Sequence, residues 1–161
     1  MKLSKFHRNA PAIVPGFSFA FLNDFIGESS AMPQDKESGA KANQYGLDCG
    51  KRIMSAIGAS NTKPGSNECS LNGELLSVHC AHKDTDSIGV TYKALEKISA
   101  VLGAFEQEDG SYVVWKMPKA RYEDLMTATR SLGTARGKVG IVKKSDFERI
   151  GTQFAKVSAF E

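Results

Sequence analysis

The chain has 161 residues, of which 41% are hydrophobic and 24% are charged. This balance is ordinary for a globular protein and excludes a chain that is disordered along most of its length. The formal net charge of +3 permits a polyanionic partner without requiring one.

Residues 1 to 34 are expected to form an N-terminal arm, ahead of a single α/β domain over residues 35 to 161. The arm starts with basic residues and continues into a short apolar run broken by prolines and a glycine. Such a run does not suit a signal peptide or a membrane span, which favours a cytoplasmic protein without membrane contact. Phe17, Phe19 and Phe21 are too apolar to remain in water, so we expect the arm to pack on the body or on a second copy.

A helix is predicted over residues 35 to 57. Leu47, Met54 and Ile57 recur at roughly helical spacing, which indicates one apolar stripe. Gly58 follows the last of them and is typical of a residue that ends a helix.

A hairpin follows the predicted helix. Asn72-Gly73 is the strongest two-residue hairpin signal, and it separates a strand at 68–71 from a strand at 74–82. The period of two along the second strand divides its side chains between two faces. One face carries Leu76, Val78 and Cys80, and the other carries Leu75, Ser77, His79 and Ala81.

The second half of the chain alternates between strands and short helices. The predicted elements are a polar loop at 83–87, a helix at 91–98, a strand at 100–105 buried on both faces, a strand at 112–117, a helix from Pro118 to about Arg130, a strand at 139–142 and a helix that starts with a capping box at Ser145 to Glu148. Hairpins and crossovers both occur, so the fold class is α/β, with a mixed central sheet flanked by helices.

One arrangement in the first half is similar to a known family. The helix ends in Ile57-Gly58-Ala59, the loop Lys63-Pro-Gly-Ser-Asn-Glu68 follows, and a hairpin then leads to a strand and a crossover helix. Over residues 37 to 118 this order resembles the PD-(D/E)xK superfamily, most closely the small type II restriction endonucleases. The resemblance implies a restriction-endonuclease-like fold. It also implies one or two Mg²⁺ ions held between an acid on each strand of the hairpin, with a lysine two residues beyond the second acid.

The residues at these motif positions depart from the family pattern. The resemblance places the first acid at Glu68, which keeps a carboxylate and would be the metal ligand. It places the second acid at Ser77, which has only a hydroxyl, and the lysine at His79, which is mostly neutral near pH 7. Mg²⁺ is therefore expected only if the protein is active. Four other acids could supply a migrated carboxylate: Asp35, Glu37, Asp48 and Glu74.

Two further interpretations concern the same strand. The run His79-Cys80-Ala81-His82 suggests zinc, but Cys80 points away from His79 on a strand, so these ligands do not converge. Ser77 with His79 suggests nucleophilic catalysis, but alternate residues on a strand stand about 7 Å apart, too far for the required hydrogen bond. The three cysteines form no CxxC pair, which indicates free, buried or partly buried thiols in a reducing compartment.

The basic residues concentrate toward the C-terminal third. A phosphate backbone could contact them, and a solvated basic loop is the alternative. The candidates for double-stranded DNA binding are Lys83, Arg130, Arg136, Lys138, Lys143 and Lys144.

Three functions remain open from the sequence. The first is a DNA-associated protein of nuclease ancestry whose metal site is impaired and which binds nucleic acid or a partner rather than cutting. The second is an active Mg²⁺-dependent DNA endonuclease, similar to type II restriction enzymes, with migrated acids. The third is a protein-interaction module of a defence or phage system without a nucleic-acid role. A palindromic DNA site would favour a homodimer.

Overall fold

The computed structural model describes residues 36–129 and 137–161, and the predictions for the N-terminal arm lie outside these ranges. The described residues form four helices and nine strands. These are α2 (Lys36–Ile57), β1 (Ser60–Asn61), β2 (Glu68–Leu71), β3 (Glu74–Ala81), β4 (Ser87–Thr91), α3 (Tyr92–Leu95), β5 (Ala100–Glu106), β6 (Tyr112–Pro118), α4 (Lys119–Leu125), β7 (Thr127–Ala128), β8 (Val139–Lys143), α5 (Lys144–Ile150) and β9 (Thr152–Val157).

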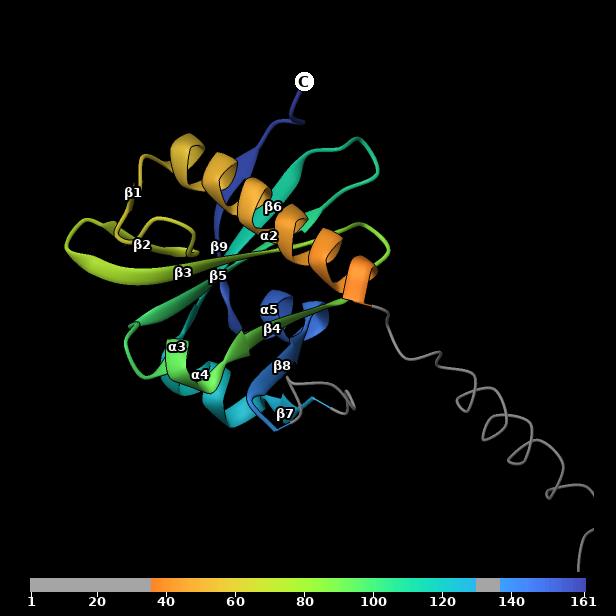
Figure 1. The fold of residues 1–161 in the computed structure, drawn as a ribbon. Coiled ribbons are helices and arrows are strands. Elements are labelled where there is room, and N and C mark those ends of the chain that lie inside the picture. The colour runs from red at the N-terminus through yellow and green to blue at the C-terminus, as the bar shows by residue number, and fades with distance from the viewer. Residues whose placement is uncertain (1–35, 130–136) are drawn as a thin grey trace, which may run out of the picture. The chain divides into compact units, whose positions relative to one another are not determined.

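The strands build two sheets (Figure 1). The large sheet has the order β1-β2-β3-β5-β6-β9, and the small sheet has the order β4-β8-β7. β3 and β5 are parallel and are joined by a crossover through β4 and α3, whereas the other described pairs are antiparallel. The predicted α/β class with a mixed sheet and flanking helices is confirmed.

Local sequence signals correctly predicted the first half of the large sheet. Asn72 and Gly73 both have positive φ, +52° and +81°, as a tight two-residue hairpin requires. The resulting β2–β3 pair has the predicted turn between its strands. β5 lies between β3 and β6, and Ala100 to Phe105 are buried, as the apolar run predicted.

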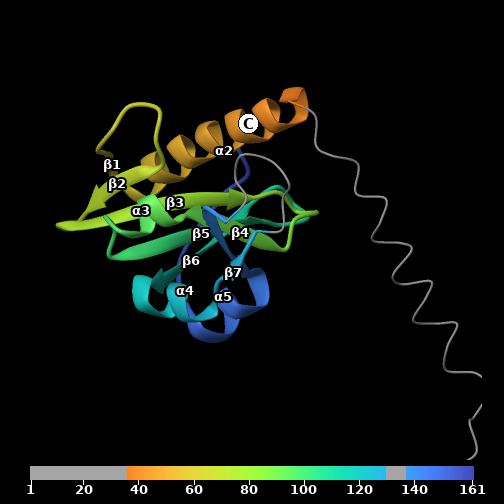
Figure 2. The ribbon, with the colours of Figure 1, turned by 60° about the horizontal axis from the view of Figure 1, so that its bottom comes forward.

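Each face of the large sheet has its own core. Figure 2 shows α2 above the sheet and α4 and α5 below it. The core under α2 includes Ile53, Met54, Leu76, Val78 and Leu102. The core on the opposite face includes side chains of the small sheet, α4 and α5, among them Val90, Val101, Phe105, Tyr122 and Phe147.

The small sheet was not predicted. Residues 87–91 form β4 rather than a loop and a helix start, and α3 is limited to Tyr92–Leu95. The helix predicted from Pro118 to about Arg130 ends at Leu125, and the short strand β7 follows. Ile88 and Val90 are buried while Gly89 is exposed. This short segment is a strand because it pairs with β8.

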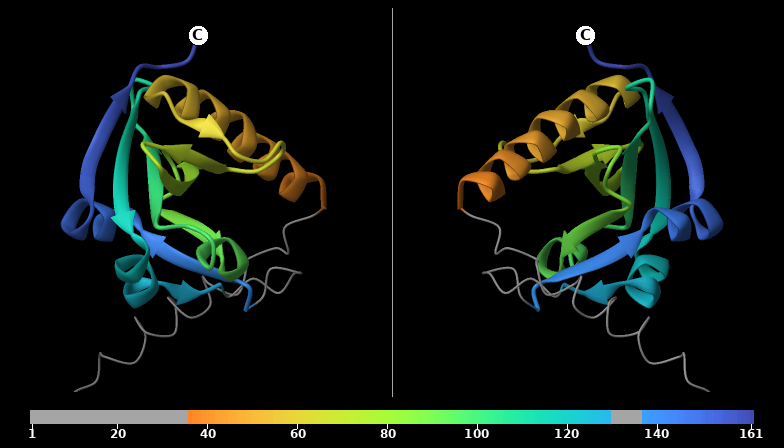
Figure 3. Two further views of the ribbon diagram at one scale, coloured as in Figure 1. Left: turned by 90° about the vertical axis from the view of Figure 1, so that its left-hand side faces the viewer. Right: turned by 90° about the vertical axis from the view of Figure 1, so that its right-hand side faces the viewer.

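Two predictions near the C-terminus were also wrong. Ser145 does not cap α5, which begins at Lys144 after Lys143 as its N-cap, without a side-chain hydrogen bond. β9 was missed, and it forms the outer edge of the large sheet beyond β6 (Figure 3). Its first three residues are exposed, so no alternation marks it in the sequence. Within the described ranges, no helix combines the length and apolar character that crossing a bilayer needs.

Candidate functional site

The motif positions lie on one face of the large sheet. Glu68 of β2 is the direct partner of Ser77 of β3, so their side chains leave the same face. His79, two residues further along β3, shares that face because the strand period is two. The structure therefore places Glu68, Ser77 and His79 on one face of the β2–β3 pair.

Ser77 and His79 are hydrogen-bonded to each other. Ser77 Oγ and His79 Nε2 are 2.8 Å apart, which corrects the prediction that alternate residues are too distant. Their backbones are separated by about two strand residues, roughly 7 Å. Side chains in strands lean along the strand direction, and the long imidazole crosses the remaining gap.

This pair supplies no charge near neutral pH. Ser77 is only 2% exposed. Desolvation of the His79 ring lowers its pKa to about 4, so the imidazole is neutral. A neutral hydrogen-bonded pair therefore stands where the family pattern has an acid and a lysine.

The other candidate acids are engaged elsewhere. Glu37 pairs with Lys41, and the Asp48 carboxylate accepts from Gln44. Glu74 accepts a hydrogen bond from Lys116 and, by strand alternation, lies on the α2 side of the sheet.

The donor set at the motif positions does not fit Mg²⁺. Asp35 lies outside the described residues. Among the residues that the structure does describe, no group of three or more His, Cys, Asp or Glu side chains could hold a metal ion. Glu68 with a hydroxyl and a neutral imidazole does not make the oxygen-rich, anionic site that Mg²⁺ prefers.

The predicted DNA-contacting lysines fall into two groups. Lys83 pairs with Glu108 at 3.8 Å, and Lys144 pairs with Glu148 at 4.0 Å. Lys138 and Lys143, at the two ends of β8, are exposed and form no ion pair with any residue that the structure describes. Arg130 and Arg136 lie outside the described residues.

Lys143 belongs to the outer face of the small sheet. Ile88, Val90 and Val142 point into the core, so the alternate residues point outward. The outward residues, termed the outer face here, are Ser87, Gly89, Thr91, Thr127, Val139, Ile141 and Lys143. A Cβ on Gly89 would lie 2.9 Å from Val139 Cγ1, so glycine leaves room for that side chain. The face carries hydroxyl groups, with a lysine at its edge.

A second polar group lies under α2. The hydroxyls of Tyr45 and Tyr112 are 2.7 Å apart. Interaction with Cys80 and, to a smaller extent, with Tyr112 lowers the pKa of Cys49 against the opposing effect of burial. Sequence reasoning missed this group, although Cys49 precedes Ile53 by one helical turn and Cys80 alternates with Val78, so both thiols could have been assigned to the same core. His79 and Cys80 face opposite sides of the sheet, as the strand period predicted, so they do not converge on one metal ion.

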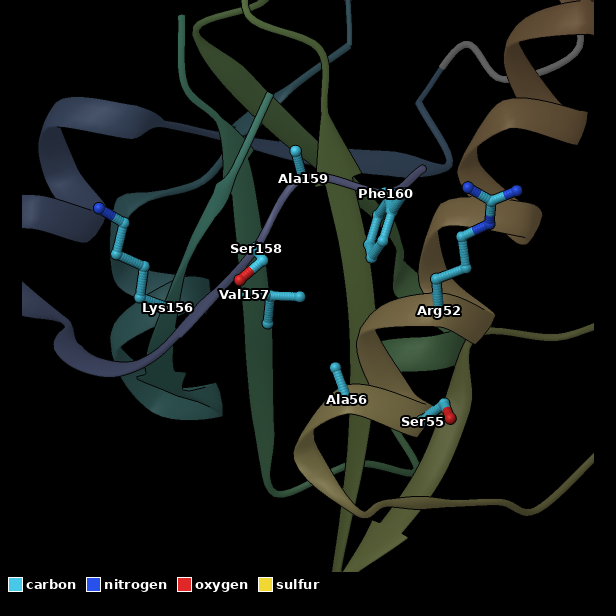
Figure 4. Close-up of a pocket in the computed structure, with 8 residues that line it drawn as sticks. All are labelled: Arg52, Ser55, Ala56, Lys156, Val157, Ser158, Ala159 and Phe160. Atoms are coloured by element: carbon cyan, nitrogen blue, oxygen red, sulfur yellow. The ribbon is translucent and has the colours of Figure 1, made fainter. Parts of the chain in front are cut away.

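A hollow of about 570 Å³ lies between α2 and the C-terminal segment (Figure 4). Its lining residues are Arg52, Ser55, Ala56, Lys156, Val157, Ser158, Ala159 and Phe160. The guanidinium carbon of Arg52 lies 5.2 Å from the centroid of the Phe160 ring. Because α2 and Val157 belong to the core under the helix, the hollow is on the face opposite to Ser77 and His79.

Comparisons with known proteins add little to this geometry. No protein-family model matches the chain, and no curated protein is significantly similar to it in sequence. Among solved structures, the chain is similar to Hjc, a Holliday junction resolvase from the archaeal hyperthermophile Archaeoglobus fulgidus. The TM-score is 0.40 and the identity 9%, over 69% of this chain and 93% of that chain. Neither family nor function follows from these similarities.

Proposed function

We propose that this protein is a restriction-endonuclease-like protein that binds DNA and does not cut it. The hairpin β2–β3, followed through a crossover by the parallel strand β5, repeats the arrangement on which the resemblance rests. The observation that carries the proposal is the hydrogen bond between Ser77 and His79. It satisfies both side chains with each other and leaves Glu68 as the sole carboxylate of the motif.

Binding is assigned to the outer face and the lysines beside it. Lys138 and Lys143 are exposed cations at the two ends of β8, and Ser87 and Thr91 add hydroxyls. Lysines neutralise phosphates and hydroxyls donate hydrogen bonds to them, contacts that do not depend on the base sequence. This favours DNA binding through the backbone over recognition of one sequence.

The test combines cleavage and binding on one preparation. Plasmid DNA incubated with the protein and Mg²⁺ or Mn²⁺ is expected to remain uncut. Binding to a duplex is expected, and log affinity should fall linearly with log salt concentration because each bound phosphate releases counterions. The Glu68→Ala variant should bind with unchanged affinity, since Glu68 contacts no phosphate in this proposal.

Two results would replace the proposal. Cleavage that disappears in Glu68→Ala would establish the alternative of an active Mg²⁺-dependent endonuclease. Absence of binding at low salt, or binding that does not respond to salt, would remove both nucleic-acid functions and leave the protein-interaction module.

A further inference from the structure

A pocket of about 340 Å³ lies where β4 runs into α3, beside the start of β8. This volume is within the range of roughly 300–1,000 Å³ that is usual for ligand sites. The lining residues are Thr91, Tyr92, Lys93, Gly137 and Lys138. Thr91 belongs to the outer face, and Lys138 is one of the lysines beside it, so the pocket adjoins the surface proposed to bind duplex DNA.

The Tyr92 ring is held in place by its surroundings. The backbone N–H of Tyr92 donates to the carbonyl oxygen of Lys138 at 3.0 Å, which ties the start of α3 to β8. The hydroxyl of Thr91 accepts from the backbone N–H of Ala94 at 3.2 Å and caps the same helix. The ring is half-buried, because it packs in part against the core under the small sheet. A ring that is already ordered loses little freedom when a ligand stacks on it.

The charges that line the pocket are both positive. Lys93 and Lys138 are exposed, and neither forms an ion pair with a residue that the structure describes. Lysines attract phosphate groups. An aromatic ring with cations beside it is the combination that binds unpaired nucleotides, because the base stacks on the ring and the cations contact the backbone.

The pocket suits a base that has left the double helix. Bases inside a duplex stack on one another, so a protein ring can stack only on a base that is unpaired or extruded. We propose that this pocket binds an unpaired nucleotide of a DNA strand, beside duplex DNA on the outer face, an inference that rests on the proposed function. The base stacks on Tyr92, and Lys93 and Lys138 contact the phosphates on its two sides. The protein therefore prefers DNA in which a duplex continues into a single strand.

The test compares three DNA molecules that share one duplex sequence. The first is blunt, the second carries a short single-stranded overhang, and the third carries the same overhang without bases. The last two have the same phosphates, so a difference between them reports stacking alone. Fluorescence anisotropy should show that the overhang with bases binds about 5- to 100-fold more tightly than the abasic overhang, the usual size of stacking on an aromatic ring.

Variants of the ring and of one lysine separate stacking from charge. Tyr92→Leu should remove the difference between the two overhangs and leave the affinity for blunt duplex unchanged. Tyr92→Phe is the matched control and should keep the difference, because it retains the ring. Lys93→Ala should weaken binding of both overhangs a few-fold and lower their salt slope by roughly 0.7, as for one contact with a single-stranded phosphate. Its affinity for blunt duplex should not change.

A crosslink on the unmodified protein locates the base, and this readout stands even where Tyr92→Leu fails to fold. With 5-iodouracil at the first unpaired position, irradiation and peptide mass spectrometry should find the adduct on Tyr92. The inference is overturned if the adduct maps elsewhere, if the two overhangs bind equally, or if their difference survives in Tyr92→Leu. Salt-dependent binding of blunt duplex together with any of these results would leave the proposed function standing. Absence of binding to all three DNA molecules would remove both.

Discussion

The two faces of β3 each hold a buried polar pair, and the pairs behave in opposite ways. On one face Ser77 and His79 are hydrogen-bonded and neutral. On the other face Cys80 and Cys49 interact, which lowers the pKa of Cys49 and raises the pKa of Cys80. The same strand thus presents a neutral pair to one core, and to the other a pair whose two pKa values shift in opposite directions.

The difference shows what burial alone can do. Desolvation is the only cause acting on His79, and it removes the charged form. At Cys49 desolvation acts in the same sense, but hydrogen bonds to the charged form outweigh it. Burial therefore leaves the pair on one face of β3 neutral, whereas neighbouring groups on the other face lower the pKa of Cys49.

The largest expected effect is a loss of stability in acid. The unfolded chain protonates His79 below its ordinary pKa of 6.5, whereas the folded protein does so only near pH 4. Its contribution is therefore complete above pH 6.5 and is lost as the pH falls toward 4, at a cost of up to about 3 kcal/mol. Urea unfolding at several pH values measures this dependence.

Two glutamine variants isolate the contribution of His79. His79→Gln should unfold with a shallower loss of stability between pH 6.5 and 4, whatever its stability at neutral pH. His82→Gln, at an exposed histidine, should keep the steep loss. Equal slopes for His79→Gln and the unmodified chain would show that the ring does not lose its charge on folding.

A methyl group added beside His79 should have the next largest effect. Gly103 is the β5 partner of His79, and a Cβ there would lie 2.9 Å from Phe147, 3.0 Å from Ile88 and 3.1 Å from Phe105. Gly103→Ala should therefore lower the free energy of unfolding by about 1–3 kcal/mol through overpacking. The measurement is chemical denaturation at neutral pH.

The control for this change lies in α2. A Cβ on Gly46 meets nothing within 4 Å, and alanine favours a helix. Gly46→Ala should therefore stabilise the protein by about 0.5–1 kcal/mol. If Gly103→Ala were equally harmless, the core under the small sheet would be looser than the distances indicate.

Removing the hydroxyl of Ser77 should cost about 1–2 kcal/mol, because His79 Nε2 loses its partner in a desolvated site. Ser87→Ala on the outer face is the control and should change stability by less than about 0.5 kcal/mol. Both are measured by urea unfolding at neutral pH. Equal effects would mean that the Ser77–His79 bond contributes nothing net to folding.

The sequence predicted the elements whose signals are local. Asn72-Gly73 predicted the hairpin, the apolar run predicted β5, and a period of two placed Ser77 and His79 on one face. The small sheet was not predicted because β4 depends on its pairing with β8, which lies far along the chain. β9 was not predicted because it is an edge strand that is exposed at most positions, so its sequence has no hydrophobic alternation.

The positions of the site residues could be predicted from the sequence, but their hydrogen bonds and pKa shifts could not. Strand geometry gave the face that Ser77 shares with His79, but the bond between them depends on how the imidazole lies along the strand. The thiol pair depends on where α2 crosses the sheet, which no spacing within the chain reveals. The lowered pKa of Cys49 then depends on Cys80 and Tyr112, which come from two different strands.

The smallest effect is expected outside both cores, at Lys143. It is exposed and forms no ion pair with the described residues, so Lys143→Ala should leave stability within about 0.5 kcal/mol. Affinity for duplex DNA should fall a few-fold at low salt, and the slope of log affinity against log salt should decrease by about 1, as for the loss of one phosphate contact. Lys63→Ala, in the exposed loop between β1 and β2, is the matched control and should change neither quantity. An equal loss in both variants would mean that binding follows net charge alone and that the outer face has no special role.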